Sequence, residues 1–148
     1  VIKVEPPEGG DQTRRAMGFR MKGSDSYGFL NMNRNKRSIT LDLKTEADRD
    51  IFFKLAATAD IIVENYRPGV MKKLGIDYEK VRAVNPGLIY ASISGSGQSG
   101  PWSQRPGFDL IAQAASGIMS ITGDADAPPA KSGCNVAYQT GRNLSSIN

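Results

Sequence analysis

The stretch that decides the fold runs from residue 63 to residue 74 and reads Val63-Glu64-Asn65-Tyr66-Arg67-Pro68-Gly69-Val70-Met71-Lys72-Lys73-Leu74. Residues 61–63 are apolar and predict a short strand, residues 67–69 predict a turn, and a helix is expected to open at Val70. Such a strand-turn-helix unit leaves free backbone N–H groups beside a ligand. An ordinary βα turn with a solvated basic helix face gives the same spacing, so the pattern alone leaves both interpretations open.

The segments around this turn alternate between strand and helix patterns. Strands are predicted over residues 1–5, 38–43, 61–63 and 88–94, and the third of these leads into the central turn. Within residues 38–43, Ile39, Leu41 and Leu43 fall on one face, which we expect to be buried. Strands separated by helices predict an α/β fold with a Rossmann-like, mostly parallel sheet.

The clearest helix pattern covers residues 46–58. Thr45 is a good N-cap, and acidic residues occupy the first turn. Apolar residues repeat every four positions along one stripe, at Ala47, Ile51, Leu55 and Ala59, and are widened by Phe52 and Ala56. Shorter helices are predicted over residues 70–73, 78–84 and about 109–120, the first of them ended by Gly75.

Less regular segments connect these elements. Residues 12–28 show no clear period and predict a surface loop or a short helix, and residues 122–134 predict a loop. Residues 135–148 have no helical or strand period, so no regular structure is expected there.

The charge of the chain is concentrated near its start. Its 148 residues carry 19 Lys and Arg against 15 Asp and Glu, a net charge of +4. Residues 1–44 hold nine of these cations and five of the acids, and the remainder is balanced. A basic segment points to an anionic partner. Because no nucleic-acid-binding motif accompanies it, a phosphorylated small molecule fits as well as nucleic acid does.

The chain contains no His and one Cys, Cys134. The lack of His excludes Ser-His-Asp and Cys-His catalysis and any His-ligated metal. A single Cys excludes a disulfide within the chain and fits a reducing compartment. No apolar run approaches the roughly 20 residues of a membrane span, and no signal peptide is visible. Because the chain starts at Val1, within a predicted strand, we expect its true beginning to be missing.

Residues 95–100 match the pattern G-x-G-x-x-G directly after a strand. In a dinucleotide-binding fold this pattern opens a helix, whose N-terminus meets the pyrophosphate. Here Pro101 and Trp102 follow, and Pro106 comes shortly after. We therefore favour a Gly-rich loop that approaches a ligand closely or moves as a lid.

Asp109 lies in the first turn of the predicted helix 109–120. The helix macrodipole favours an acid there by about 0.3–1 kcal/mol, which is a sufficient structural reason for it. A role in chemistry is the alternative, because neighbouring carboxyls can raise each other's pKa and share a proton.

Several motifs, in this order, resemble those of the family III CoA-transferases of the CaiB/BaiF type, the superfamily of formyl-CoA transferase and α-methylacyl-CoA racemase. They lie at residues 1–7, 10–14, 33–44, 63–75, 85–90 and 92–101, and the resemblance extends to about residue 137. It implies that residues 1–134 are the N-terminal CoA-binding α/β region of a larger interlocked-dimer fold, and that residues 135–148 form an irregular tail that departs from the family.

The resemblance also implies a set of coenzyme A contacts. These contacts fall at Arg14, Leu41, Lys44, Asn65, Tyr66, Arg67 and Lys73. Arg14 and Lys73 would meet phosphates, where a guanidinium fork can bind two oxygens at once. Leu41, Asn65 and Tyr66 would flank the adenine and the pantetheine arm. Taken singly, Lys44 could be an exposed strand-end lysine and Lys73 a helix-end cation.

The catalytic step implied by the resemblance uses an Asp carboxylate, which attacks the acyl-CoA thioester and later carries CoA as an aspartyl thioester. Tyr138 occupies the position of that Asp. A phenol cannot form the mixed anhydride, so we expect this chain to be incomplete and inactive alone. A non-catalytic CoA- or nucleotide-binding fragment is the alternative. A racemase is disfavoured because the step Gly107-Phe108-Asp109 lacks the family's catalytic His.

The partners expected from the resemblance are an acyl-CoA, a free carboxylic acid and a second copy of the same protein. Coenzyme A enters as a substrate, and no metal, nucleic acid or membrane is expected. The expected location is the cytoplasm, or the mitochondrion or peroxisome in a eukaryote.

Overall fold

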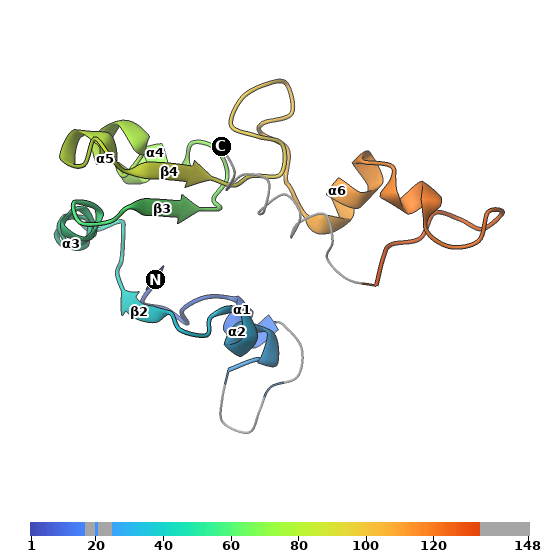
Figure 1. The fold of residues 1–148 in the computed structure, drawn as a ribbon, viewed down its shortest axis with the longest axis horizontal. Coiled ribbons are helices and arrows are strands. Elements are labelled where there is room, and N and C mark those ends of the chain that lie inside the picture. Colours follow the sequence, from blue (N-terminus) through green and yellow to red (C-terminus); the bar gives the residue numbers. More distant parts are fainter. Residues whose placement is uncertain (17–19, 21–24, 134–148) are drawn as a thin grey trace. The chain divides into compact units, whose positions relative to one another are not determined.

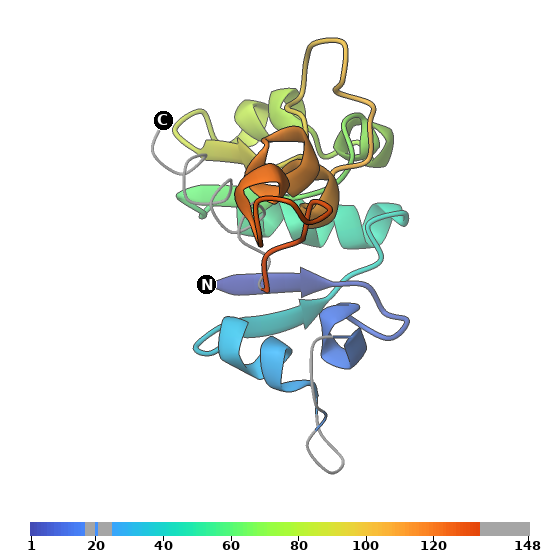
Figure 2. The same ribbon diagram turned by 90° about the vertical axis from the view of Figure 1, so that its right-hand side faces the viewer.

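The computed structural model describes residues 1–16, 20 and 25–133 (Figure 1). The chain divides into two compact units, Val1–Ala57 and Thr58–Asn148. Each unit contains one parallel pair of strands with short helices beside it (Figures 1 and 2). The predicted α/β class and parallel strand direction are confirmed.

In the first unit, β1 (Ile2–Glu5) pairs with β2 (Arg37–Thr40), so that Val4 lies opposite Ile39. Helices α1 (Thr13–Ala16) and α2 (Tyr27–Met32) lie between these strands in the chain. The sequence pattern did not predict α2 as a helix. Ser26 holds its start, because the buried Ser26 hydroxyl donates to the carbonyl of Thr13 at 2.6 Å and accepts from the amide of Phe29 at 3.1 Å.

Strand β2 is shorter than predicted and ends at Thr40 instead of residue 43. The amide of Leu41 still bonds to the carbonyl of Glu5 at 3.0 Å, and the Leu41 side chain is buried as expected. Asp42 then leaves the ladder, because its amide donates to the Asp48 carboxylate at 2.6 Å. This bond starts the turn into the next helix.

Helix α3 (Glu46–Ala56) confirms the predicted helix and its N-cap, since the Thr45 hydroxyl accepts from the amide of Asp48. The predicted apolar stripe is confirmed at Phe52 and Ala56, which are buried, and wrong at Ala47 and Ile51, which are exposed. Asp48 explains why the buried face of α3 is rotated from the predicted one. Residues 48, 52 and 56 share one face of a helix, and the bond from Asp48 to the preceding turn turns that face inward.

In the second unit, β3 (Ile61–Glu64) pairs with β4 (Ile89–Ser92), so that Glu64 lies opposite Ser92. Two short helices, α4 (Val70–Leu74) and α5 (Tyr78–Val84), connect the strands. The buried apolar residues of this segment are Met71, Ile76, Val81 and Leu88. The predicted helix end at Gly75 is confirmed, because Gly75 adopts a left-handed φ of 73° that favours glycine.

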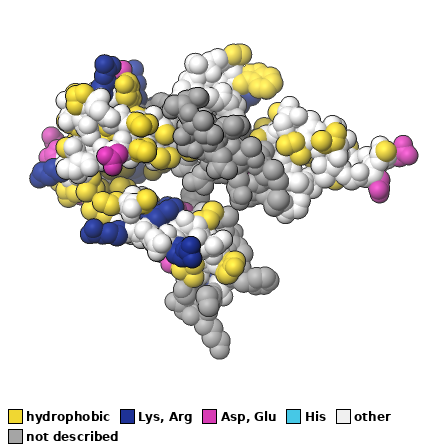
Figure 3. All heavy atoms as spheres, viewed as in Figure 1, with side chains coloured by type: hydrophobic (Ala, Val, Ile, Leu, Met, Phe, Trp, Pro, Cys, Tyr) yellow, Lys and Arg dark blue, Asp and Glu magenta, His cyan; other side chains and the backbone are white. Residues whose placement is uncertain are grey.

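The predicted helix 109–120 is interrupted. Helix α6 (Asp109–Ala115) stops at Ser116, and a 3₁₀ helix, η1 (Ile118–Ile121), follows. Gly117 separates the two with a φ of 79°, a conformation that a regular helix cannot contain. Apolar side chains are exposed along this segment (Figure 3). Leu110 and Ile121 are two of them.

Candidate functional site

The turn after β3 is held together by a buried carboxylate. Glu64, the last residue of β3, is only 8% exposed, and its Oε2 accepts a hydrogen bond from the Tyr66 amide at 2.8 Å. This bond bends the chain back over the strand end, so that the side chains of Asn65, Tyr66 and Arg67 are exposed. The structure therefore brings these three predicted contact residues together at one turn. Lys73 follows on α4, where it is exposed.

A cavity of about 310 Å³ opens beside this turn, at the carboxyl ends of β3 and β4. Its lining includes Glu64 and Asp77, the cations Arg67 and Lys72, and the rings of Tyr78 and Tyr90; Ser92 and Gln98 also line it. In open α/β sheets, ligands bind outside the carboxyl ends of the parallel strands. Its position and its mixed chemistry make this cavity a candidate ligand site.

Tyr90 is a fixed part of this cavity. Its hydroxyl donates to the carbonyl of Ile76 at 3.2 Å, and its ring meets the ring of Tyr78 edge to face, with centroids 6.0 Å apart. Burial raises the pKa of Tyr90 well above its usual value, and the nearby charges of Glu64 and Asp77 raise it further. The phenol therefore stays protonated at neutral pH and serves as a donor.

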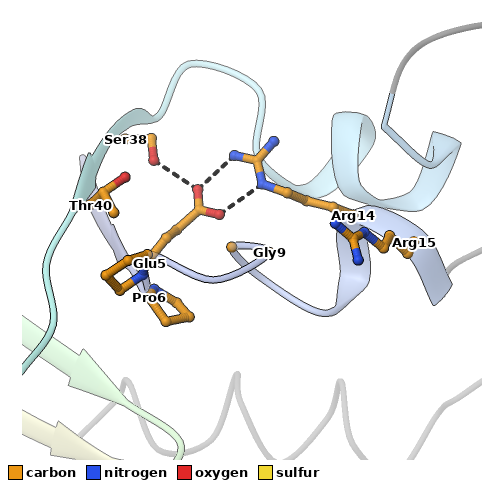
Figure 4. Close-up of a pocket in the computed structure, with 9 residues that line it drawn as sticks. Glu5, Pro6, Gly9, Arg14, Arg15, Ser38 and Thr40 are labelled. Atoms are coloured by element: carbon orange, nitrogen blue, oxygen red, sulfur yellow. Dashed lines mark hydrogen bonds and ion pairs between the residues drawn. The ribbon is translucent and has the colours of Figure 1, made fainter.

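A second cavity, of about 330 Å³, lies in the first unit beside Glu5 (Figure 4). Two nitrogens of Arg14 donate hydrogen bonds to the buried Glu5 carboxylate. Nε donates to Oε2 and Nη2 donates to Oε1, each at 2.7 Å. The third nitrogen, Nη1, bonds to Asp25 at 2.6 Å, and the guanidinium lies 4.0 Å from the centre of the Phe29 ring. Arg14 thus holds α1 to β1 in this structure. Its predicted contact with a phosphate stays a prediction, and there the phosphate would compete with two carboxylates.

Other residues of this cavity share the Glu5 carboxylate. The Ser38 hydroxyl donates to Oε1 at 2.8 Å and the Asp11 amide donates to Oε2 at 2.9 Å. The Arg14 hydrogen bonds are the largest cause that lowers the pKa of Glu5 to about 2. The exposed Arg15 also lines the cavity and forms no ion pair with the described residues.

The two other contact residues predicted for this unit lie close together in the chain. Leu41 is 4% exposed, directly after β2. Lys44 is exposed in the turn before α3, where its carbonyl accepts from Arg49 at 2.7 Å. Their predicted roles toward coenzyme A stay predictions.

The Gly-rich stretch forms a closed loop, and no helix opens after residue 100. The backbone at Gly95 lies against the backbone at Gly107, and the two residues close the loop. A Cβ added to Gly95 would lie 2.1 Å from the Cα of Gly107. Only glycine fits such a crossing of two backbones. The loop between them, residues 96–106, contributes Gln98 to the cavity of about 310 Å³. Its exposed Trp102 ring is covered by Arg105 at 4.6 Å.

Asp109 begins α6 and accepts a hydrogen bond from the side-chain amide of Gln113, which is fully buried. The Gln113 Oε1 in turn accepts from the amide and the hydroxyl of Ser132, at 2.9 and 3.1 Å. Gln113 therefore ties Asp109 to the segment that precedes Gly133. Tyr138, predicted to occupy the position of the nucleophile, lies outside the described residues.

The family model for CoA-transferase family III matches residues 1–145. The chain belongs to this family. It is 50% identical over 132 residues to acetyl-CoA:oxalate CoA-transferase of Acetobacter aceti, an alignment that covers 89% of the chain and 33% of that enzyme. It is 45% identical over 133 residues to human succinyl-CoA:glutarate CoA-transferase, covering 90% of the chain and 30% of that enzyme.

Comparison with solved structures gives the same result. A CaiB/BaiF family protein from Brucella suis superposes with a TM-score of 0.82 at 39% identity, over 98% of this chain and 42% of that chain. A hypothetical protein from Mycobacterium tuberculosis gives a TM-score of 0.85 at 34% identity, over 98% and 40%. The chain thus spans about a third of the length of the curated relatives named above. The predicted resemblance to a CaiB/BaiF fold, and to only part of it, is confirmed.

Two further findings concern this family III chain. No helix within residues 1–16, 20 and 25–133 is both long and apolar enough to cross a membrane. Within the same residues, no group of three or more His, Cys, Asp or Glu side chains is placed to hold a metal ion.

The sequence analysis of this CoA-transferase family member missed three polar residues at the two cavities and near Asp109. They are Glu5, Glu64 and Gln113, and all three are buried. A signal existed for Glu5 and Glu64, since each is an acid at the end of a predicted strand. A strand end of that kind is where an α/β sheet presents its polar groups. Gln113 carried no comparable signal.

Proposed function

We propose that this chain is the CoA-binding part of an enzyme that moves CoA from an acyl-CoA thioester to a free carboxylic acid. Membership of CoA-transferase family III supports the reaction class. Two relatives carry names that pair a short acyl-CoA with a dicarboxylate, oxalate or glutarate. A carboxylate acceptor of that kind is the substrate class we propose.

The observation that carries this proposal is the turn over residues 65–69. It lies at the carboxyl end of β3 and exposes Asn65, Tyr66 and Arg67 beside a cavity. A ligand that combines phosphates with an aromatic base needs cations and flat side chains in one place. Arg67, Lys72 and the two cavity tyrosines supply both.

The chemistry follows from a carboxylate nucleophile. Its oxygen attacks the thioester carbon, so that CoA leaves as a thiolate and a mixed anhydride forms. The thiolate then attacks the aspartyl carbonyl, which releases the donor acid and leaves an aspartyl-CoA thioester. The acceptor carboxylate attacks this thioester and expels the thiolate, and the thiolate finally attacks the acceptor carbonyl and frees the Asp.

Tyr138 bears on the second candidate function, a CoA-binding piece without catalysis. A phenol has a reference pKa near 10 and is a poor nucleophile at neutral pH. We therefore propose that the chain binds CoA but does not exchange it. In the complete enzyme we propose a homodimer, and Asp109 is an auxiliary acid that orients the acceptor.

Calorimetric titration with CoA, and with 3′-dephospho-CoA as the control, tests the binding. We expect saturable binding of CoA that weakens when the 3′-phosphate is absent. A parallel assay of CoA exchange between an acyl-CoA and oxalate or glutarate tests the chemistry, and we expect none with the chain alone. Binding of neither nucleotide would refute the CoA-binding role, and exchange without Asp at position 138 would refute the assigned nucleophile position.

A further inference from the structure

The loop 96–106 is attached to the rest of its unit mainly at its neck, the backbone contact between Gly95 and Gly107 (Figure 1). Among the described residues, no hydrogen bond or ion pair joins residues 96–106 to a residue outside the loop. A segment with so few bonds to its surroundings moves at a low cost in free energy. The loop is therefore free to turn about its neck.

Contacts within the loop preserve its own shape. The Ser103 amide donates to the carbonyl of Gly100 at 3.2 Å, and the Arg105 amide donates to the carbonyl of Trp102 at 2.8 Å. The Arg105 guanidinium also lies 4.6 Å from the centre of the Trp102 ring. Compact loops whose ends lie close together are often functional. Because its contacts are internal, this loop should move as one body.

Ser94, directly before the neck, points to a second position of the loop. Its hydroxyl is buried and has no hydrogen-bond partner among the described residues. A buried hydroxyl without a partner is costly. A turn of the loop about the neck is the nearest movement that brings other backbone groups to Ser94. The arrangement seen here is thus not the one that satisfies this hydroxyl.

The loop already reaches the cavity at the ends of β3 and β4, because Gln98 lines it. Trp102 is 53% exposed, so a turn toward the cavity would cover an apolar ring that solvent now reaches. We propose that residues 96–106 form a lid that closes as one body over this cavity when coenzyme A binds, and that closure covers Trp102. Lids of this kind exclude water and retain the ligand. The proposal rests on the proposed function, because coenzyme A is the ligand that closes the lid.

The first experiment uses Trp102 as the reporter, because it is the single tryptophan of the chain. Its fluorescence and its quenching by acrylamide are measured while CoA is added, with binding followed by calorimetry in the same buffer. Saturating CoA should shift the emission to shorter wavelength and lower the quenching constant about twofold or more, since closure covers the indole. Inorganic pyrophosphate at equal ionic strength is the control and should leave the quenching unchanged.

The second experiment removes the lid. Gly95 and Gly107 lie so close that their Cα atoms are within the spacing of consecutive residues, about 3.8 Å, so residues 96–106 can be excised and the two glycines joined. The excised chain should release CoA about tenfold faster, because lost retention acts on the dissociation rate. Tyr27→Ala, which changes an exposed ring of the other unit, should release CoA at the unchanged rate.

The outcomes separate the lid from the CoA-binding role. If CoA binds but leaves the quenching of Trp102 unchanged, or if the folded excised chain releases CoA no faster, the lid proposal fails and the CoA-binding role stands. If CoA does not bind at all, both fail. Should the excised chain not fold, the fluorescence of the unchanged chain decides alone.

Discussion

At the scale of single residues, Glu5 controls how the first unit responds to acid. Arg14 and the other donors lower its pKa to about 2 in the folded chain. A carboxyl whose folded pKa is depressed stabilises the fold above its unfolded pKa, and this stabilisation is lost as the pH falls through the folded value. The shift corresponds to about 3 kcal/mol in the free energy of unfolding at neutral pH.

Glu5→Gln should therefore lower the free energy of unfolding by about 3 kcal/mol at neutral pH, because the half-buried Arg14 fork loses the charge of its buried partner Glu5. The deficit should shrink as the pH falls from about 4.5 toward about 2, where the unchanged chain also loses the ion pair. Urea unfolding, monitored by the Arg14 Nε–H resonance, measures the loss at neutral pH and its decrease in acid. Glu8→Gln is the control, since it removes the same charge from an exposed residue. An equal loss in both variants at all pH values would contradict the role of Glu5.

The types of residue at the site could be predicted from the sequence, but their pairing could not. Arg14 and Arg67 were predicted as contact residues, because the motifs that resemble the family contain them. The fork from Arg14 to Glu5 joins residues nine positions apart and adds Asp25 from a third segment. Such a network depends on how the loop 6–12 folds back onto β1, and no local pattern encodes that.

At the scale of elements, the loop 96–106 depends on the contact between Gly95 and Gly107. A Cβ on Gly107 would lie 2.2 Å from the Cα of Gly95, and both neighbours at that point are backbone. Gly107→Ala should therefore open the neck of the loop and lower the free energy of unfolding by about 1–3 kcal/mol.

Thermal unfolding and amide exchange in residues 96–106 would detect this change. Gly87→Ala is the matched control, because the nearest atom to its Cβ is the Asn85 Oδ1 at an ordinary 3.9 Å. It should leave the loop unaffected. Unchanged exchange in Gly107→Ala would show that the neck is not a fixed contact.

Gln113 connects α6 to the segment at Ser132. The stabilities of Gln113→Glu and Gln113→Leu should therefore depend on pH in different ways. Leu removes the donor to Asp109 and the acceptor for Ser132, which costs about 1–3 kcal/mol at any pH. Glu keeps the acceptor for Ser132 but adds a second carboxyl beside Asp109. The two carboxyls then share one proton, and the pKa at which the pair loses this proton is raised. The Gln113→Glu protein should therefore be nearly as stable as the unchanged chain in mild acid and lose stability as the pH rises.

Melting temperatures of the three proteins, measured in mild acid and at mildly alkaline pH, give the comparison. A parallel pH profile for the Glu and Leu variants would mean that Asp109 and residue 113 do not interact as the structure shows.

Elements with local caps and turn residues were predicted well, and those that depend on side-chain contacts between distant segments were not. The helices near 46–58, 70–73 and 78–84 carry caps and turn residues that act locally, and all three are present. Helix α2 depends on the contact of Ser26 with Thr13, which lies 13 residues away. The end of α6 depends on the single left-handed residue Gly117. Neither determinant changes the hydrophobic period.

At the scale of the whole molecule, the surplus of four positive charges permits two kinds of anionic partner, a nucleic acid or a small phosphorylated molecule. A nucleic-acid surface needs a continuous row of free cations along a phosphate backbone. In the first unit, however, Arg14 is paired with Glu5 and Asp25, and Lys3 is paired with Asp11. These acids interrupt the positive surface, so a compact ligand with few phosphates fits better than a duplex.

We therefore expect CoA to bind with a moderate dependence on salt, and duplex DNA to bind weakly. Between about 50 and 200 mM NaCl, a protein that makes six to ten phosphate contacts loses about 10³–10⁵ in DNA affinity. CoA offers far fewer phosphates, so the loss of CoA affinity over the same range should be much smaller. Calorimetry with CoA and fluorescence anisotropy with a labelled duplex, over one salt series, measure both. Tight duplex binding with a steep salt slope and no affinity for CoA would identify the basic segment as a nucleic-acid surface instead.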